Sequence, residues 1–380
     1  MIEEAQILPQ PSHSTTPTSS SQRRNLALEP QGNPSSRLET PSATGERHNV
    51  ESTDESNPMT RILITGSADG LGALAARQLI QRGHAVILHA RNSQRAEAAR
   101  QACPGAEAVL IGDLSSIAGT KKLAADAKAF ARSSSPPSTN TNTTATSNTT
   151  TTTSATNTTI SRPINCIIHN AGLYNVKLER SPDEHKIPTL TAVNTIAPYL
   201  LTCLMDRPER LVFVSSSHHL DGDPSLSDIT WQERRDGTWD FLRAYKDSKL
   251  HDVLLAKAFA RRWGGKSTRD PGDGGGGDDD VVAGVRSNAL DPGWVPTKMG
   301  GPQAPGSLDA AVETYVMLAE GSGGGGGSSS SKGGKGGQAT GKLFGRGGLE
   351  RSPKLEADDV ATQDRLLEIL ERITGVKVPD

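Results

Sequence analysis

A tyrosine and a lysine stand four residues apart in YKDSK, Tyr245 to Lys249, and this pair could transfer a proton. On a helix, residues i and i+4 lie on one face, so both side chains can reach the same cleft. An ammonium group beside a phenol can lower the phenol pKa from about 10 toward neutrality, which suits a general acid or base. Two exposed polar side chains on an ordinary amphipathic helix would have the same spacing. On such a helix the following apolar residues would face a core: Leu250, Val253, Leu254 and Phe259.

A glycine-rich turn, TGSADGLG at 65–72, is the second candidate site. It lies between the apolar run RILI at 61–64 and a segment whose leucines and alanines have helical spacing. Glycines there allow a tight turn and let a diphosphate approach the free N–H groups of a helix N-terminus. The alternative is a tight turn without a ligand, but the position in the first βαβ unit favours a dinucleotide. The residues expected to contact it are Gly66, Ser67, Asp69, Gly70, Leu71 and Gly72.

The end of the second predicted strand bears on which dinucleotide binds. A carboxylate there would hydrogen-bond the ribose hydroxyls of NAD, but the sequence is HARN, 89–92. Arg91 could instead pair with a 2′-phosphate, although Asp69, in the glycine turn, supplies no second cation. A surface arginine on a loop is the alternative. We therefore favour NADP over NAD as the cofactor.

Apolar runs and helix-forming segments alternate along the chain. The predicted strands lie within 61–66, 84–90, 106–114, 164–172, 209–217 and 283–293. The predicted helices include 71–83, 93–102, 117–130 and 189–205. Strands that are nearly continuous apolar runs are typical of a parallel sheet covered on both faces. We predict an α/β fold with a doubly wound parallel sheet of the Rossmann type, in three α/β/α layers.

Four low-complexity segments interrupt this pattern, at 1–58, 133–159, 264–280 and 321–337. They are rich in Ser, Thr, Asn, Gly or Pro and bury too little apolar surface to offset the entropy of ordering them. We predict a disordered N-terminal extension over 1–58. Residues 59–380 would form one Rossmann-type domain, with the other three segments inserted between elements. Without the four segments about 260 residues remain, which suits a single domain.

Composition limits the partners and the compartment. The formal net charge of −2 gives no reason to expect a nucleic acid or an anionic membrane as partner. No long apolar run is present, and the N-terminal segment does not resemble a secretory or mitochondrial signal, so we expect a cytoplasmic protein. Cys103, Cys166 and Cys203 lack metal-ligand spacing and are expected to be reduced. His218 and His219 have no Cys or carboxylate at ligand spacing, so no metal site is predicted.

The order of the motifs TGxxxGxG, HNAG, VSSS and YxxxK resembles the short-chain dehydrogenase/reductase family, classical type. The similarity extends over about 61–378 without the insertions. ARN, VSSSHH and LDPGWVPTKMGG are most similar to the retinol dehydrogenases and WW-domain oxidoreductase-like proteins. Two departures stand out, namely His169 in place of the first asparagine of the usual NNAG and a long separation between Ser216 and Tyr245.

The resemblance implies four catalytic residues, Asn194, Ser216, Tyr245 and Lys249. Ser215 or Ser217 would replace Ser216 if the strand end shifted by one residue. Tyr245 would protonate the substrate oxygen and Lys249 would lower its pKa. Ser216 would stabilise the charge that develops on that oxygen, and Asn194 would orient Lys249 through water.

The resemblance also implies cofactor contacts outside the glycine turn. Tyr245 and Lys249 belong to this group as well as to the catalytic group. An aspartate turn would contact the adenine, the HNAG motif would adjoin the turn, and the segment after the sixth strand would bind the nicotinamide end. These residues are Asp113, Leu114, Asn170, Ala171, Gly172, Pro292, Gly293, Val295 and Thr297.

We therefore predict an NADP(H)-dependent oxidoreductase that interconverts a carbonyl and an alcohol by hydride transfer. Trp231, Trp239 and Trp294 favour a lipophilic or aromatic substrate, although each could belong to a core. A catalytically idle NADP-binding scaffold with partner-recruiting disordered tracts is the alternative, and the four catalytic residues argue against it. A wrongly assigned or decaying reading frame is a third interpretation, which a cooperative melt would contradict. The helices containing Asn194 and Tyr245 form the usual dimer face of the family, so a homodimer is conceivable.

Overall fold

The computed structural model describes residues 59–133, 162–183, 186–234, 236–265, 284–321 and 339–380. The predicted extension 1–58 and nearly all of the three predicted insertions lie outside these residues. In the chain those insertions fall between α3 and β4, between α6 and β6, and between α7 and β7. The division at residues 58 and 59 stays a prediction.

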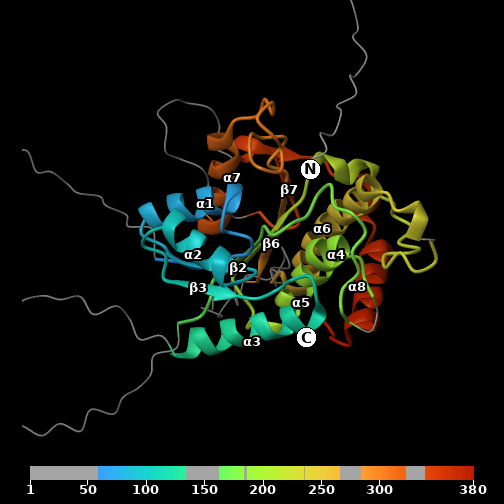
Figure 1. Ribbon diagram of the computed structural model, residues 1–380, viewed down its shortest axis with the longest axis horizontal. Coiled ribbons are helices and arrows are strands. Elements are labelled where there is room, and N and C mark those ends of the chain that lie inside the picture. Colours follow the sequence, from blue (N-terminus) through green and yellow to red (C-terminus); the bar gives the residue numbers. More distant parts are fainter. Residues whose placement is uncertain (1–58, 134–161, 184–185, 235, 266–283, 322–338) are drawn as a thin grey trace, which may run out of the picture. The chain divides into compact units, whose positions relative to one another are not determined.

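One sheet runs through the described residues, with strand order β3-β2-β1-β4-β5-β6-β7-β8 (Figure 1). Neighbouring strands are parallel from β3 to β7, and β8 pairs with β7 in the antiparallel sense. The strand bounds are β1 Arg61–Ile64, β2 Ala85–Ala90, β3 Ala108–Ile111, β4 Cys166–His169, β5 Arg210–Val214, β6 Arg286–Leu290, β7 Leu343–Phe344 and β8 Glu350–Arg351. The strand order reverses between β1 and β4, where open α/β sheets bind their ligands. The predicted doubly wound sheet is confirmed, with an antiparallel strand added at one edge.

The helices alternate with the strands, as the sequence predicts. The longer ones are α1 Gly70–Gln81, α2 Ser93–Ala102, α3 Ile117–Ser133, α5 Ala197–Leu204, α6 Phe241–Trp263, α7 Leu308–Glu320 and α8 Val360–Thr374. The predicted helix over 189–205 is in three parts, since α4 Thr189–Thr191 continues into a π-helical turn, Ala192–Ile196, and then into α5. Short 3-10 helices cover Ser217–Asp221, Asp236–Thr238, Arg346–Gly348 and Leu355–Asp358.

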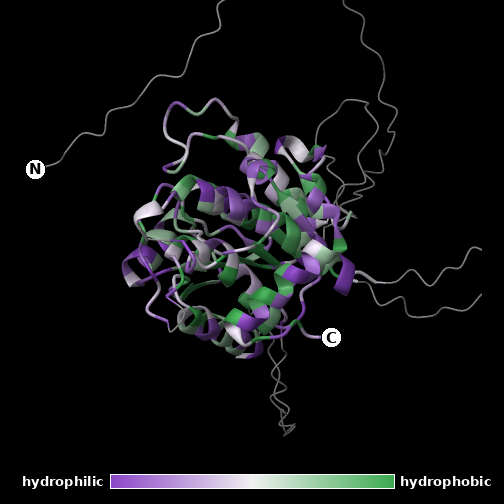
Figure 2. Ribbon diagram, turned by 90° about the vertical axis from the view of Figure 1, so that its right-hand side faces the viewer, coloured by the Kyte–Doolittle hydropathy of each residue, from purple (hydrophilic) through white to green (hydrophobic). Residues whose placement is uncertain are grey.

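Two apolar cores lie on the two faces of the sheet. Successive strand residues point to opposite faces, so Ile62 and Ile64 pack with α1 and α7 while Leu63 packs with α3, α5 and α6. The strands are therefore apolar at nearly every position. Figure 2 shows hydrophobic residues along the strands and polar residues on the outer sides of the helices. This double burial is the physical reason why the strands are continuous apolar runs.

The last helix, α8, and the segment after it lie against the outer side of α6 and α5. On α6, Arg261 pairs with Asp364, and the Trp263 indole N–H donates to the Pro379 carbonyl at 3.0 Å. The Tyr199 hydroxyl of α5 donates to the Val376 carbonyl at 2.6 Å. The C-terminal part of the chain therefore forms an outer layer over these two helices.

Candidate active site

Tyr245 and Lys249 lie one turn apart on α6 and face the same buried site. The Asp240 carboxylate begins this helix by accepting hydrogen bonds from the backbone N–H groups of Leu242 and Arg243, at 2.9 and 3.1 Å. Tyr245 is 8% exposed and Lys249 is 5% exposed. The Lys249 ammonium nitrogen is 5.5 Å from the centroid of the Tyr245 ring. The i, i+4 spacing therefore places both groups together, as the sequence predicts.

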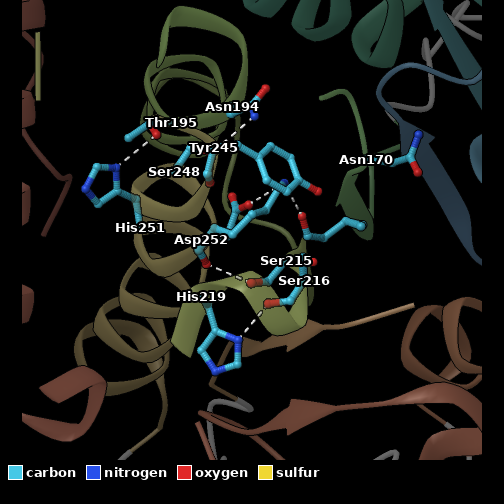
Figure 3. A network of polar contacts seen from close by, with 12 residues as sticks. Asn170, Asn194, Thr195, Ser215, Ser216, His219, Tyr245, Ser248, His251 and Asp252 are labelled. Carbon is cyan, nitrogen blue, oxygen red and sulfur yellow. Dashed lines mark hydrogen bonds and ion pairs between the residues drawn. The ribbon is translucent and has the colours of Figure 1, made fainter. Parts of the chain in front are cut away.

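Three serines follow β5, and Figure 3 shows two of them, Ser215 and Ser216. The buried Ser215 hydroxyl donates to the backbone carbonyl of Lys249 at 2.7 Å, so it links β5 to α6. Ser217 is exposed. Ser216 is the serine whose side chain acts on Tyr245, where it lowers the phenol pKa. Ser216 is thus the serine beside the phenol, which is the position that the resemblance implies.

The charges around Tyr245 oppose the effect of its burial. Burial raises the Tyr245 pKa and outweighs the Lys249 ammonium and Ser216, which lower it, so the pKa lies above its ordinary value and not toward neutrality as expected from the sequence. Burial also disfavours the charged form of Lys249, but the Asp252 carboxylate and Tyr245 outweigh it and raise the Lys249 pKa. The Asp252 carboxylate lies 2.9 Å from the ammonium nitrogen, and burial raises its pKa to about 6. The lysine and the aspartate are therefore both charged at neutral pH.

Asn194 lies in the π-helical turn and fixes the backbone after β4. Its side-chain oxygen accepts from the Leu173 N–H at 2.8 Å, and its amide donates to the Leu173 carbonyl and to the Ser248 hydroxyl, each at 3.1 Å. A Cβ on Gly172 would lie 3.7 Å from the Asn194 side-chain oxygen and 3.9 Å from the Lys249 nitrogen. The structure thus brings Asn194, Gly172 and Lys249 together. A π-turn is a common device for aiming a side chain at a functional site.

The glycine turn fits a dinucleotide because its glycines have distinct roles. Gly66 has φ +64° and a Cβ there would be 2.8 Å from the Cα of Ala171. A Cβ on Gly72 would be 2.5 Å from the Asn170 amide nitrogen, so both glycines allow close packing. Gly70 has φ +57°, and the nearest described atom to its Cβ would be the Thr297 Cβ, 4.0 Å away. The backbone at Gly70 is therefore open to a ligand at the start of α1.

The HNAG motif ties this turn to β4. The Asn170 amide donates to the carbonyls of Thr65 and Gly66 at 2.9 and 3.0 Å. The backbone N–H groups of Asn170 and Ala171 both donate to the Thr65 hydroxyl at 3.0 Å. The Tyr315 hydroxyl, on α7, donates to the Asn170 side-chain oxygen at 2.8 Å, a support that the sequence did not predict. Asn170 thus holds the turn rather than pointing to solvent.

His169, the departure from the family motif, belongs to the core. It is buried, stacks on Phe213 with ring centroids 4.7 Å apart, and shares a 2.9 Å hydrogen bond with the Thr202 hydroxyl. Burial lowers its pKa to about 3, so it is neutral. It therefore acts as a packing residue here.

The side of the site where the adenosine half is expected carries two arginines. Arg91 is exposed immediately after β2. Arg95, on the first turn of α2, forms an ion pair with Asp69 of the glycine turn at 2.6 Å. Asp69 therefore brings a second cation to this side, which the sequence prediction missed. The Asp113 carboxylate accepts from the Ser115 N–H at 2.9 Å, and Leu114 is buried.

Two predicted contact residues of the glycine turn have other neighbours. The Ser67 hydroxyl donates to the Ile64 carbonyl and accepts from the His89 N–H, each at 2.9 Å, so its side chain braces the turn from inside. Leu71, in the first turn of α1, is half-buried and packs against the apolar core on that face of the sheet. Only their backbone groups can face a ligand without disturbing these contacts.

The loop after β6 returns to the glycine turn. The Asp291 carboxylate accepts from the Gly293 N–H at 2.9 Å, and Gly293 has φ +70°. Pro292 and Val295 are buried, and Thr297 lies beside Gly70. The segment implied to bind the nicotinamide end therefore lies next to the turn implied to bind the diphosphate.

Aromatic rings surround Tyr245 on its other side. Its ring centroid is 4.8 Å from that of Tyr174 and 5.8 Å from that of His218, both edge-on, and Tyr174 also contacts Phe241 at 5.6 Å. Tyr174 and Phe241 were not predicted from the sequence.

The three tryptophans that the sequence associates with the substrate differ in their environments. Trp231 is 4% exposed and packs on Trp239 at 4.7 Å, so it is a core residue. Trp239 is partly buried, and its indole N–H donates to the Val176 carbonyl at 3.0 Å. Trp294 is 60% exposed. Trp294 is thus the tryptophan that stays on the surface of a loop.

The three cysteines, Cys103, Cys166 and Cys203, are free and buried. Within the part of the chain that the structure describes, no cluster of three or more His, Cys, Asp or Glu side chains could hold a metal ion. In the same ranges no helix has the length and apolar character needed to cross a membrane.

Known proteins are similar to this chain over most of its length. A family model described as short chain dehydrogenase matches residues 60–133. An uncharacterized oxidoreductase of Emericella nidulans is 38% identical over 321 residues, which cover 84% of this chain and 98% of the relative. The short-chain dehydrogenase chry4 of Gibberella zeae is 36% identical over 319 residues, again covering 84% and 98%.

A more distant relative and a solved structure are also similar to this chain. Retinol dehydrogenase 13 of Homo sapiens is 25% identical over 350 residues, covering 84% of this chain and 85% of the relative. The crystal structure of an uncharacterized protein from Mycobacterium paratuberculosis has a TM-score of 0.57 at 21% identity, covering 86% of this chain and 98% of that one, and it supports the fold. The chain belongs to the short-chain dehydrogenase family and is an oxidoreductase that uses a nicotinamide cofactor.

Proposed function

We propose that the protein interconverts a carbonyl and an alcohol with NADP(H), using Tyr245, Lys249, Ser216 and Asn194. The observation that carries the proposal is the position of Lys249, whose ammonium nitrogen lies 5.5 Å from the centroid of the buried Tyr245 ring and, like Ser216, acts to lower the phenol pKa. The glycine turn and the loop after β6 adjoin each other at Gly70 and Thr297. This arrangement provides a proton donor, a charge that tunes it, and a cradle for a dinucleotide.

The chain itself handles the proton. When bound, the cofactor supplies or accepts the hydride at the substrate carbon. In the reducing direction the Tyr245 hydroxyl gives its proton to the substrate oxygen, and the phenolate that remains is stabilised by the Lys249 ammonium. The Ser216 hydroxyl donates to the same oxygen as negative charge develops on it. In the oxidising direction the phenolate takes the proton back.

Asn194 acts by positioning its neighbours. Its three hydrogen bonds fix Leu173 and Ser248, which adjoin Gly172 and Tyr245 in the chain or on α6. We infer that it keeps the backbone after β4 at the right distance from Lys249, and that its implied contact with the lysine runs through water.

The preference for NADP over NAD is supported by Arg91 and Arg95. The end of β2 carries no acidic residue to bind ribose hydroxyls, and Arg91 is exposed there. Arg95 adds a second guanidinium group on the first turn of α2, held by Asp69. Two guanidinium groups beside a helix N-terminus suit a 2′-phosphate.

The rings around Tyr245 support a lipophilic or aromatic substrate. Tyr174, Phe241 and His218 offer faces and edges that prefer aromatic partners or a flat carbonyl compound. A cytoplasmic location and a small-molecule partner remain part of the proposal. An idle cofactor-binding scaffold would have no need for an ammonium group and a serine that both act on a buried phenol.

The test is turnover by the purified full-length protein with NADPH and with NADH, over a panel of aldehydes, ketones and quinones. We expect turnover that is faster with NADPH and falls at least about a hundredfold in Tyr245→Phe, because general acid catalysis contributes about 10²–10⁴. Trp294→Phe is the control, because it changes an exposed aromatic residue and leaves the proton donor Tyr245 in place. NADPH binding without turnover across the panel would favour the scaffold, and equal rates in wild type and Tyr245→Phe would refute the assigned donor.

A further inference from the structure

His89, on β2, is a buried side chain that joins two loops of the expected cofactor site. It is 3% exposed. Its Nδ1 accepts a hydrogen bond from the Gly66 N–H at 3.0 Å, and its Nε2 lies 2.8 Å from the Gly112 carbonyl oxygen. The glycine turn contains Gly66, and Gly112 immediately precedes Asp113. One imidazole ring therefore spans the gap between the diphosphate loop and the adenine loop.

The hydrogen bonds fix the state of this ring. Because the Gly66 N–H is a donor, Nδ1 must be unprotonated, and the single ring proton must sit on Nε2 and be donated to Gly112. Burial lowers the His89 pKa, with the Gly112 hydrogen bond and the Asp113 charge acting in the opposite direction. The neutral ring is thus both an acceptor on one side and a donor on the other.

Backbone contacts of the same residue add to the link. The His89 N–H donates to the Ser67 hydroxyl at 2.9 Å, and its carbonyl accepts from the Ser67 N–H at 3.2 Å. Gly66 is also pinned on its far side, because it packs on Ala171 and its carbonyl accepts from the Asn170 amide. The entry of the turn is therefore clamped between β2 and β4, and the ring of His89 supplies the clamp on the β2 side.

We propose that His89 is a positioning residue of the cofactor site, whose neutral imidazole holds the glycine turn and the adenine loop in the geometry that binds the dinucleotide. This inference rests on the proposed function, since it assumes that the glycine turn and the adenine loop hold the cofactor. The inference goes beyond the proposed function, because His89 has no expected contact with the cofactor itself.

The experiment compares three substitutions that keep different parts of the ring. His89→Leu removes both hydrogen bonds, His89→Asn can keep an acceptor for the Gly66 N–H, and His89→Gln can keep a donor for Gly112. His84→Leu is the matched control. His84 is equally buried, directly before β2 at the opposite end of the strand, where it accepts from the Thr60 N–H at 3.2 Å and contacts Glu320 at 2.9 Å.

We would measure the dissociation constants for NADPH and NADH by calorimetry, and the melting temperature. We would also compare the change in KM for the cofactor with the change in kcat for each variant. We expect His89→Leu to weaken both dinucleotides about tenfold or more, because a buried N–H left without an acceptor disturbs the turn. KM should rise with little change in kcat, and His89→Asn should recover much of the affinity. His84→Leu should lower the melting temperature and leave both dissociation constants unchanged.

Each contrary outcome has its own meaning. If His89→Leu melts lower but binds both dinucleotides as wild type does, His89 is only a packing residue and the inference is wrong. If His89→Leu fails to fold, the folded His89→Asn and His89→Gln variants decide the question. Wild-type affinity of both variants for NADPH and NADH would show that the inference is wrong. If the wild-type protein binds neither dinucleotide, the proposed function falls first and the inference falls with it.

Discussion

The charge on Lys249 is balanced by a residue on its own helix. Asp252 lies one turn further along α6, with its carboxylate 2.9 Å from the ammonium nitrogen and both side chains buried. The lysine also donates to the Val214 carbonyl at 2.7 Å. The negative charge of Asp252 raises the pKa of Lys249 and also that of Tyr245. It therefore keeps the lysine charged while it weakens the effect of that charge on the phenol.

Replacing Asp252 by asparagine should show the effect of its charge on Tyr245. The amide keeps an oxygen for the ammonium group but removes the negative charge, so the pKa of Tyr245 should fall. Alcohol oxidation needs the phenolate and loses rate as pH drops below that pKa. The acid limb of log kcat/KM should therefore move to lower pH in Asp252→Asn.

The matched control is Asp247→Asn, on the same helix. The Asp247 carboxylate accepts from the Asp223 N–H at 2.9 Å and is not among the main charges that act on Tyr245. This variant should keep the wild-type pH profile. An acid limb that stays in place in Asp252→Asn, or moves to higher pH, would contradict the electrostatic role given to Asp252.

At the scale of elements, the glycine turn between β1 and α1 determines how a ligand can approach the start of α1. Gly66 and Gly72 are closed in by neighbouring atoms, but Gly70 combines a positive φ with open space in front of it. The free N–H groups of the first turn of α1 begin at this residue. A methyl group at Gly70 would therefore strain the backbone and stand where we propose that the diphosphate approaches.

Gly70→Ala should weaken NADPH binding at least about tenfold and lower the free energy of unfolding by about 1 kcal/mol. Gly83→Ala is a control with the same backbone strain, since Gly83 has φ +85° at the far end of α1 and no described atom within 4 Å of its added Cβ. It should cost similar stability and leave the dissociation constant unchanged. Equal affinity in Gly70→Ala and wild type, measured by calorimetry, would mean that the ligand does not approach there.

The elements differ in how far the sequence determines them. The bounds of α2 were predicted without error because helix-forming residues between two apolar runs leave little choice. Strands β7 and β8 have two residues each, which is too short for a periodic pattern. The π-helical turn was missed because every face of 192–196 is largely buried, so one extra residue per turn leaves no mark on the apolar pattern. Helix α8 has a clear amphipathic pattern that the prediction did not use.

The contacts of the candidate site also differ in how far the sequence determines them. Tyr245 and Lys249 were placed together by a local spacing rule, and Asp252 could have been found by the i, i+3 form of that rule. The contact of Tyr315 with Asn170 joins residues far apart in the chain and carries no local signal. The pairing of Asp69 with Arg95 depends on how α2 packs beside the glycine turn, which only the tertiary structure determines.

At the scale of the whole molecule, α8 bears on the oligomeric state. The family resemblance offered the outer sides of α5 and α6 as a dimer face. Here Leu366, Leu367 and Leu370 of α8 are buried in the core cluster that includes those helices. The same chain therefore covers surface that a second subunit would otherwise bury. Ion pairs such as that between Arg261 and Asp364 lie at the margin of this contact.

We expect the protein to be a monomer at micromolar concentration, with a mass of 40.0 kDa by light scattering after size exclusion. A stable dimer would need about 800 Å² of suitable surface on each subunit, and α8 places mainly polar residues outside. Leu366→Asp would expose the apolar face of α6 by loosening α8, so this variant should melt at a lower temperature and associate as concentration rises. A wild-type mass of twice the monomer value would show that another face pairs, or that α8 moves aside to let α5 and α6 meet their copies.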